Sequence, residues 1–184
     1  MTSKDFYKNQ AKNVRITPRK QMILQSIMPY LRPDLKVLDI GCGDGYIANC
    51  MNIFSKVTAF DRDVAVQKER FSRVKFLQGD FFCELPNEMF DIVVAFDVLE
   101  HLPNKEILIQ ELVKRSKKFI IVNQPDQEDK SQPYDKRVTP IEMITWMNSF
   151  GFKIVELKHF KFGKTESYNF MVFRKEDNYF SSWY

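Results

Sequence analysis

The segment VLDIGCGDGYIA, residues 37–48, constrains the fold more than any other part of the chain. An apolar run ends at Asp39, and Gly41, Gly43 and Gly45 follow on alternate residues. Glycine lacks a Cβ atom, so its backbone can take a positive φ and can be approached closely by a ligand. A helix that begins after such a loop offers unpaired N–H groups to that ligand. The segment therefore predicts a strand, a loop of bare backbone and a helix, with a ligand site at the loop.

Short apolar runs and helical segments alternate along the rest of the chain. We expect strands at 36–40, 56–61, 74–78, 90–96 and 118–123, and helices at 18–31, 103–116 and 139–150. Runs of this kind without strict alternation favour a parallel sheet that helices cover on both faces. Residues 152–160 and 168–175 then predict an antiparallel hairpin around Gly163. The pattern indicates an α/β, doubly wound fold.

The composition bounds the domain organisation and the compartment. With 184 residues, 44% hydrophobic and 28% charged, the chain is expected to form one domain with an ordinary core. Cys42, Cys50 and Cys83 are scattered and form no CxxC pair, which argues against a disulfide framework and a cysteine-rich zinc site. They fit a reducing, cytoplasmic environment. No stretch is apolar for long enough to span a membrane, and the net charge of +4 permits an anionic partner without requiring one.

Two ligand classes use a strand, a glycine loop and a helix in this order. A dinucleotide site needs G-x-G-x-x-G, and Tyr46 stands where its third glycine would be. The sequence Asp39-Ile-Gly41-Cys-Gly43-Asp-Gly45 instead resembles motif I of the class I S-adenosylmethionine (SAM) dependent methyltransferases, in particular the small O-methyltransferases of the ubiquinone-biosynthesis type. A tight strand-to-helix turn without a ligand remains the alternative at this point.

Three further segments resemble the same family in the expected order. They are VTAFDRD, which contains Asp61, FLQGDFF, which contains Asp80 and Phe81, and FDIVVAFDVLEHL, which contains Phe96. The resemblance implies that Asp61 accepts the ribose hydroxyls, that Asp80 receives the adenine amino group and that Phe81 packs on the adenine ring. It implies a cofactor site for SAM, with S-adenosylhomocysteine (SAH) as product, made of Asp39, Gly41, Gly43, Gly45, Asp61, Asp80, Phe81 and Phe96.

The resemblance extends over most of the chain. It covers about residues 6 to 175 and implies a Rossmann-like sheet of seven mostly parallel strands, the last one antiparallel. Residues 1–184 are then one methyltransferase domain: 1–31 form an N-terminal lid and helix, 35–175 the core and 176–184 a tail. The stretch with Tyr7, Arg15 and Arg19 resembles the lid of small family members, which closes over the cofactor.

His101 is the candidate catalytic residue. A hydroxyl acceptor must lose a proton during methyl transfer, and histidine is suited to accept a proton near neutral pH. His101 and Glu100 directly follow the fourth predicted strand, close to where the resemblance places the methyl group. The other interpretation, that Glu100 and His101 begin the next helix, stays open. We expect His159, on a late strand, to be a surface or edge residue.

Two motifs of other methyltransferase classes are missing or incomplete in this sequence, and this narrows the class of methyl acceptor. No N/D-P-P-Y/F sequence follows the fourth strand, as it would in methyltransferases of nucleic-acid amino groups. Asp97, Glu100 and His101 resemble part of a magnesium cluster of RNA-end methyltransferases, but the loop PYDKRVTP has no further histidine, so we expect no metal. A small or medium acceptor such as a sugar or a lipid-linked precursor is favoured. An RNA or protein methyltransferase, or a non-catalytic SAM-binding subunit with a protein partner, remains an alternative.

Overall fold

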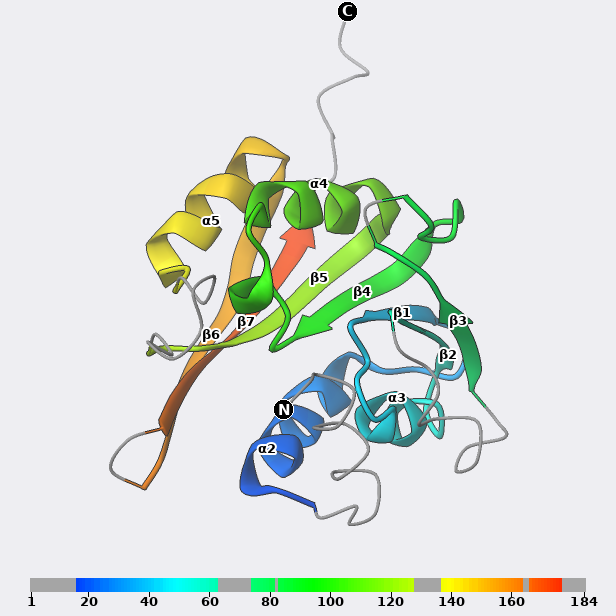
Figure 1. Ribbon diagram of the computed structural model, residues 1–184, viewed down its shortest axis with the longest axis horizontal. Helices are drawn as coiled ribbons and strands as arrows, with labels where there is room; N and C mark the ends of the chain where they lie inside the picture. Colours follow the sequence, from blue (N-terminus) through cyan, green and yellow to red (C-terminus); the bar gives the residue numbers. More distant parts are fainter. Residues whose placement is uncertain (1–15, 63–73, 82, 128–136, 164–165, 177–184) are drawn as a thin grey trace, which may run out of the picture.

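The computed structural model describes residues 16–62, 74–81, 83–127, 137–163 and 166–176. In these residues one seven-stranded sheet has the order β3-β2-β1-β4-β5-β7-β6 (Figure 1). The strands are β1 (Lys36–Ile40), β2 (Lys56–Asp61), β3 (Lys75–Gln78), β4 (Phe90–Phe96), β5 (Ser116–Pro125), β6 (Phe152–Phe162) and β7 (Glu166–Lys175). The first five strands run parallel, and β7 pairs antiparallel with both β5 and β6. The predicted fold class, with its antiparallel last strand, is confirmed.

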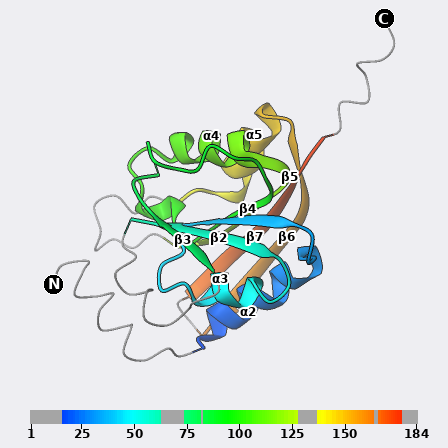
Figure 2. The same ribbon diagram turned by 90° about the vertical axis from the view of Figure 1, so that its right-hand side faces the viewer.

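Helices cover both faces of the sheet (Figure 2). On one face lie α2 (Pro18–Ile27), which a short 3₁₀ turn, η1 (Met28–Tyr30), extends, and α3 (Tyr46–Met51). On the other face lie α4 (Lys105–Arg115) and α5 (Pro140–Ser149). A second 3₁₀ turn, η2 (Leu99–His101), follows β4. The doubly wound arrangement explains why the parallel strands are apolar on both sides.

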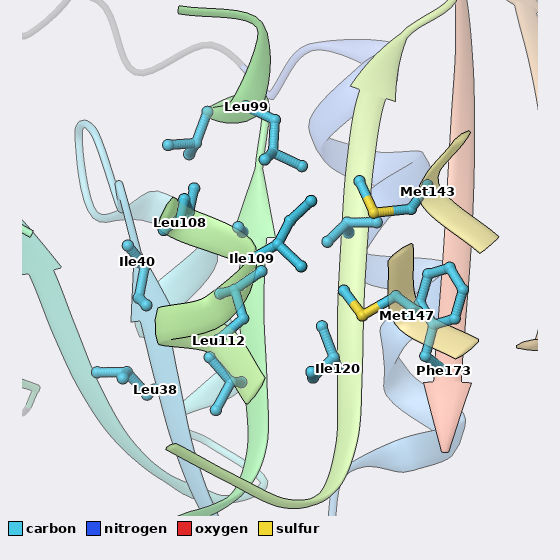
Figure 3. Packing of buried hydrophobic residues seen from close by; sticks show 14 of the residues in the cluster. Leu38, Ile40, Leu99, Leu108, Ile109, Leu112, Ile120, Met143, Met147 and Phe173 are labelled. Atoms are coloured by element: carbon cyan, nitrogen blue, oxygen red, sulfur yellow. The ribbon is translucent and has the colours of Figure 1, made fainter. Parts of the chain in front are cut away.

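The core consists of two apolar layers, one on each face of the sheet. Figure 3 shows the layer under α4 and α5, where side chains of β1, β5 and β7 meet residues of both helices. Its labelled members are Leu38, Ile40, Leu99, Leu108, Ile109, Leu112, Ile120, Met143, Met147 and Phe173. The other layer takes the alternate strand residues, such as Val37 and Val94, with Ile23 and Ile27 of α2. Full burial of one such side chain contributes roughly 1.5–3 kcal/mol, so these layers hold the sheet and helices together.

Most element ends lie within two residues of the sequence prediction, and two differences have a clear physical reason. The first helix was predicted to reach residue 31, but α2 ends at Ile27 and continues only as the 3₁₀ turn. Pro29 has no N–H to donate to the carbonyl four residues earlier, which stops α-helical bonding there. The strand predicted at 118–123 extends over Ser116–Pro125, because it pairs with β4 on one side and β7 on the other. Gln124 and Pro125 therefore also belong to the sheet, where they pair with Asn169 and Tyr168 of β7.

β6 is the outer strand of the hairpin and forms one edge of the sheet. Its residues alternate between half-buried and exposed along most of its length. The register with β7 shifts between Ile154 and Glu156, which leaves Val155 in a bulge. Lys153, Lys158 and Lys161 lie along this strand, so the edge carries several ammonium groups.

Parallel pairing brings the predicted site residues to one edge of the sheet. Asp39 of β1 lies beside Ala59 of β2 and Val94 of β4 in register. The chain therefore leaves β1, β2 and β4 at neighbouring points of the carboxyl edge, where ligands of open α/β sheets bind. No helix in the described ranges is long and apolar enough to cross a membrane.

The N-terminus of α5 provides a test of local stability. Thr139 Oγ1 accepts a hydrogen bond from the Glu142 backbone N–H at 3.2 Å, and Glu142 Oε2 accepts one from the Thr139 N–H at 2.7 Å. Thr139→Ala removes the side-chain half of this capping box and should lower the free energy of unfolding by about 1 kcal/mol in urea denaturation. Thr145→Ala, an exposed threonine inside the same helix, is the control. Equal losses in both variants would contradict the capping role.

Candidate functional site

The glycine loop between β1 and α3 has a left-handed backbone at each of its glycines. The φ angles are +73° at Gly41, +54° at Gly43 and +71° at Gly45. A Cβ atom at Gly41 would clash with the Val98 side chain, and one at Gly45 would lie 2.8 Å from Phe76 Cζ. Among the residues that the structure describes, a Cβ atom at Gly43 would have no heavy atom within 4 Å. Packing inside the fold therefore requires the outer two glycines, whereas the middle one faces open space that a ligand could occupy.

The end of β2 holds the loop in this shape. The backbone N–H groups of Gly41 and Cys42 both donate to the Phe60 carbonyl oxygen, at 2.8 and 3.1 Å. The Gly43 N–H donates to Asp61 Oδ2 at 2.7 Å. A carboxylate that accepts a backbone N–H makes a charge-assisted bond of this length. The predicted ribose residue, Asp61, is thus also the residue that fixes the centre of the glycine loop.

Asp39 lies under the loop as a buried acid. Its exposed fraction is 2%. Burial, together with repulsion from the nearby carboxylates of Asp61 and Asp44, raises the pKa of Asp39 to about 8. A positively charged group brought to this edge would favour the ionised form of Asp39, because it would offset both the burial and the repulsion.

The turn after β4 is held from two sides. Asp97 has a φ of +55°, in the left-handed region that residues other than glycine, asparagine and aspartate rarely adopt. Its N–H donates to the Asn123 carbonyl oxygen at 2.8 Å, and Asn123 Nδ2 donates to Asp97 Oδ1 at 2.8 Å. Arg19 Nε lies 3.2 Å from Asp97 Oδ2. Burial raises the pKa of Asp97, and Arg19 and Asn123 oppose that shift.

His101 lies at the end of this turn, in η2. Its side chain is 51% exposed, and its Nε2 lies 4.0 Å from Oε1 of the buried Glu100. Lys105 Nζ donates to the carbonyl oxygens of Leu99, Glu100 and Leu102 at 2.9, 3.2 and 3.0 Å. An ammonium group stabilises the carbonyl end of a helical turn. The turn that carries His101 is therefore held from behind, and His101 itself is accessible to a substrate.

The remaining predicted cofactor residues follow β3 and end β4. Asp80 is exposed after β3, and its N–H donates to Glu84 Oε2 at 2.7 Å. Phe81 packs partly against the core under α4. The Phe96 side chain is buried in the other layer, stacked on Phe170 at a centroid distance of 6.4 Å. Only the backbone of Phe96 is therefore placed to meet a ligand at the edge.

The structure thus groups some predicted residues by direct contact and others only by strand order. Asp39, the glycine loop and Asp61 form one connected unit. Asp80 and Phe81 follow β3 and His101 follows β4, two strands of the same edge that are separated by β2 and β1. His159 lies on β6, exposed, with Nδ1 3.0 Å from Asn169 Oδ1, as expected for an edge residue. Of the lid residues, Tyr7 and Arg15 lie outside the described residues.

Sequence reasoning missed three residues of this edge. They are Lys105, Asn123 and Lys20, which pairs with Asp44 of the glycine loop. Asn123 and Lys20 act across long sequence separations, so no local pattern marks them. Lys105 lies only four residues after His101, so its position in the sequence could have indicated its contact with the turn that carries His101. In the described residues no group of three or more His, Cys, Asp or Glu side chains could hold a metal ion.

Comparison with known proteins places these features in a family. The family described as "Methyltransferase domain" matches residues 15–157. A probable S-adenosylmethionine-dependent methyltransferase of Mycobacterium tuberculosis is 30% identical over 129 residues, which cover 66% of this chain and 47% of that protein. A ubiquinone biosynthesis O-methyltransferase of Rickettsia bellii is 33% identical over 115 residues, which cover 56% of this chain and 48% of that protein. The chain thus spans about half the length of these curated relatives.

A solved structure shares the fold at low sequence identity. The magnesium protoporphyrin IX methyltransferase of Synechocystis, crystallised with bound SAM, superposes with a TM-score of 0.76. The match covers 95% of this chain and 92% of that one, at 15% identity. At this identity the likeness supports the fold alone, including the antiparallel end of the sheet.

The raised pKa of Asp39 predicts a pH dependence of stability. The unfolded carboxyl has an ordinary pKa of about 3.9, so between about pH 4 and pH 8 the unfolded chain releases a proton that the folded chain keeps. Stability contributed by this group therefore falls as the pH rises through that window. Asp39→Asn removes the titration. Urea denaturation then gives the free energy of unfolding of Asp39→Asn minus that of the wild type. We expect this difference to be more than ~1 kcal/mol larger at pH 8 than at pH 5. A difference that stays constant with pH would refute the assignment.

Proposed function

Because this chain belongs to the class I SAM-dependent methyltransferase family, we propose that it transfers a methyl group from SAM to a hydroxyl oxygen of a small or medium acceptor. The matches to known proteins confirm two predictions made from the glycine loop, the methyltransferase family and its cofactor SAM. The observation that carries the proposal is the glycine loop that follows the buried Asp39, whose left-handed backbone at Gly43 is held by Asp61 at the carboxyl edge of the sheet.

The residues present fit SAM at this edge. Gly43 has no side chain that would block a ligand, and the buried Asp39 together with the half-buried Asp61 favours a cationic ligand, which SAM is at its sulfonium and ammonium groups. In our proposal Asp61 binds the ribose hydroxyls, Asp80 the adenine amino group and Phe81 the adenine ring. The remaining contacts come from Asp39, Gly41, Gly43, Gly45 and the backbone of Phe96. SAM supplies an electrophilic methyl group on a positively charged sulfur.

The chain's own contribution to catalysis is alignment and proton removal. Holding the acceptor oxygen in line with the methyl group can supply several kcal/mol by positioning alone. His101 is the proposed general base, which takes the hydroxyl proton on an imidazole nitrogen as the oxygen attacks. Its exposure makes it accessible, and Lys105 holds the turn on which it stands. The buried Glu100 beside it would stabilise the imidazolium that forms.

The nature of the acceptor is supported by the relatives and by the size of the fold. A sequence relative is named for ubiquinone biosynthesis, and a protein with the same fold is named for magnesium protoporphyrin IX. Ubiquinone and magnesium protoporphyrin IX are both small or medium molecules. We propose an acceptor of that size class, handled by residues 35–175 as a single catalytic core.

A cytoplasmic location is part of the proposal. It is supported by Cys42, Cys50 and Cys83, all of which are free thiols.

The cofactor claim is tested by titration calorimetry of the purified protein with SAH, with NADH as the comparison ligand. We expect micromolar binding of SAH and none of NADH. Asp61→Ala should weaken SAH binding by about 1–3 kcal/mol, because it strands the groups that the carboxylate serves. Asp91→Ala is the matched control: Asp91 also accepts a backbone N–H, that of Lys36 at 2.9 Å, but at the opposite end of the sheet. Unchanged affinity in Asp61→Ala would show that the ribose lies elsewhere.

The base is tested with tritiated SAM and a panel of hydroxylated small molecules, including sugars and catechols. On any acceptor that the wild type methylates, His101→Gln should reduce kcat about 100-fold or more, because it removes the general base. SAH affinity should stay within twofold. His159→Gln replaces the exposed histidine of β6 and should leave kcat unchanged. Full activity of His101→Gln would leave Glu100 and His101 with a structural role only.

A further inference from the structure

The first turn of α2 carries two adjacent cations that reach opposite flanks of the glycine-loop edge. Lys20 pairs with Asp44 in the loop itself, and Arg19 pairs with Asp97 in the turn after β4. The two acids belong to segments more than fifty residues apart in the sequence. One turn of helix therefore bridges both sides of the proposed cofactor site.

The Lys20 contact fixes the start of α3. Lys20 Nζ bonds Asp44 Oδ2 and lies 5.3 Å from the centroid of the Tyr46 ring. Asp44 Oδ1 in turn accepts the Tyr46 backbone N–H at 3.1 Å. Both charged side chains are only 15% exposed, so the pair is largely shielded from solvent. Loss of the lysine would leave Asp44 partly buried without its cation, which is costly.

The Arg19 contact fixes the turn that leads to His101. Its Nε reaches Asp97, its Nη1 donates to the Tyr168 hydroxyl at 3.3 Å, and its guanidinium carbon lies 5.4 Å from the Tyr168 ring centroid. With Asn123 on the other oxygen, both oxygens of the Asp97 carboxylate are engaged. A left-handed backbone such as that of Asp97 costs free energy and persists only where its surroundings hold it. Arg19 is one of the groups that hold it.

The rest of α2 is anchored differently. Met22, Ile23 and Ile27 are buried in the core layer under α2 and α3, whereas residues 16–18 are exposed. Apolar packing thus secures the helix from residue 22 onward. Its first turn depends on the Arg19 and Lys20 contacts, in addition to the Thr17 side-chain cap.

We propose that Arg19 and Lys20 are positioning residues, which couple the docking of the first turn of α2 to the shape of the cofactor site. Lys20 sets the glycine loop and Arg19 sets the turn before His101. Cofactor affinity and catalytic geometry then depend on the same helical turn, although neither residue takes part in methyl transfer. This inference rests on the proposed function for the identity of the ligand, but the structural coupling is measurable without it.

The test uses Lys20→Gln and Arg19→Gln, which remove each charge and keep much of the side-chain length. Lys20→Arg restores a cation opposite Asp44. The matched control is Lys36→Gln, which breaks the Lys36–Glu88 ion pair of 3.1 Å at the other end of β1. Each full-length protein is titrated with SAH by calorimetry. Hydrogen exchange is followed by mass spectrometry in residues 40–48 and 96–102, and urea midpoints are recorded.

We expect the dissociation constant of SAH to rise about five- to tenfold in Lys20→Gln and in Arg19→Gln, in the ordinary range of coupling between sites. Exchange should accelerate in 40–48 for the first variant and in 96–102 for the second. Lys20→Arg should bind SAH within twofold of the wild type, and Lys36→Gln should match the wild type throughout. A merely stabilising role would lower the urea midpoint without moving SAH affinity.

Dissociation constants within twofold of the wild type in both Gln variants would overturn the inference, as would failure of Lys20→Arg to restore binding. If one variant does not fold, the other decides the result. If the wild type itself binds no SAH, the proposed function fails and exchange alone decides the coupling. Faster exchange confined to 40–48 and 96–102 then supports it, and unchanged exchange overturns it.

Discussion

The position of β1 between two parallel neighbours is the constraint on which the rest of the structure depends. In register, Asp39 lies beside Ala59 and Val94, so the chain leaves three strands at adjacent points of one edge. A slip of one residue would turn every side chain of β1 to the opposite face and separate the glycine loop from Asp61. Because both faces of β1 are buried, such a slip would place side chains that fit one core layer into the other, where they would no longer pack. The core therefore fixes the register, and the register assembles the site.

Charge at this edge is distributed unevenly. Asp44 and Asp97 each form an ion pair with a cation of α2. Asp39 differs, because burial and the carboxylates of Asp61 and Asp44 raise its pKa. Paired acids stabilise the shape of a site, because their charge is already balanced. A buried acid with like-charged neighbours favours a ligand that brings positive charge. The paired acids Asp44 and Asp97 therefore hold the shape of the edge, and our proposal gives Asp39 a different task, which is to favour the cationic cofactor.

The sequence was sufficient for what depends on local pattern. The strands of the parallel sheet, the helix predicted at 139–150 and the glycine loop each follow from residues close together in the chain, and each was predicted. The contacts made by Arg19, Lys20 and Asn123 were not, because they join residues that only the folded topology brings together. The burial of the Phe96 side chain likewise depends on Phe170 of β7. How the site residues act remains a prediction.

The lysine-bearing edge of the sheet bears on how the molecule behaves in a crowded solution. A strand with a free edge can recruit another strand and begin an extended assembly. In β6 the bulge at Val155 interrupts the regular spacing of backbone donors and acceptors, and Lys153, Lys158 and Lys161 put charged groups along the edge that an incoming strand would have to desolvate. The hairpin that completes the sheet thus also discourages growth of the sheet into aggregates. The exposed Val155 and Leu157 can lie on this strand because the features around them oppose strand-to-strand association.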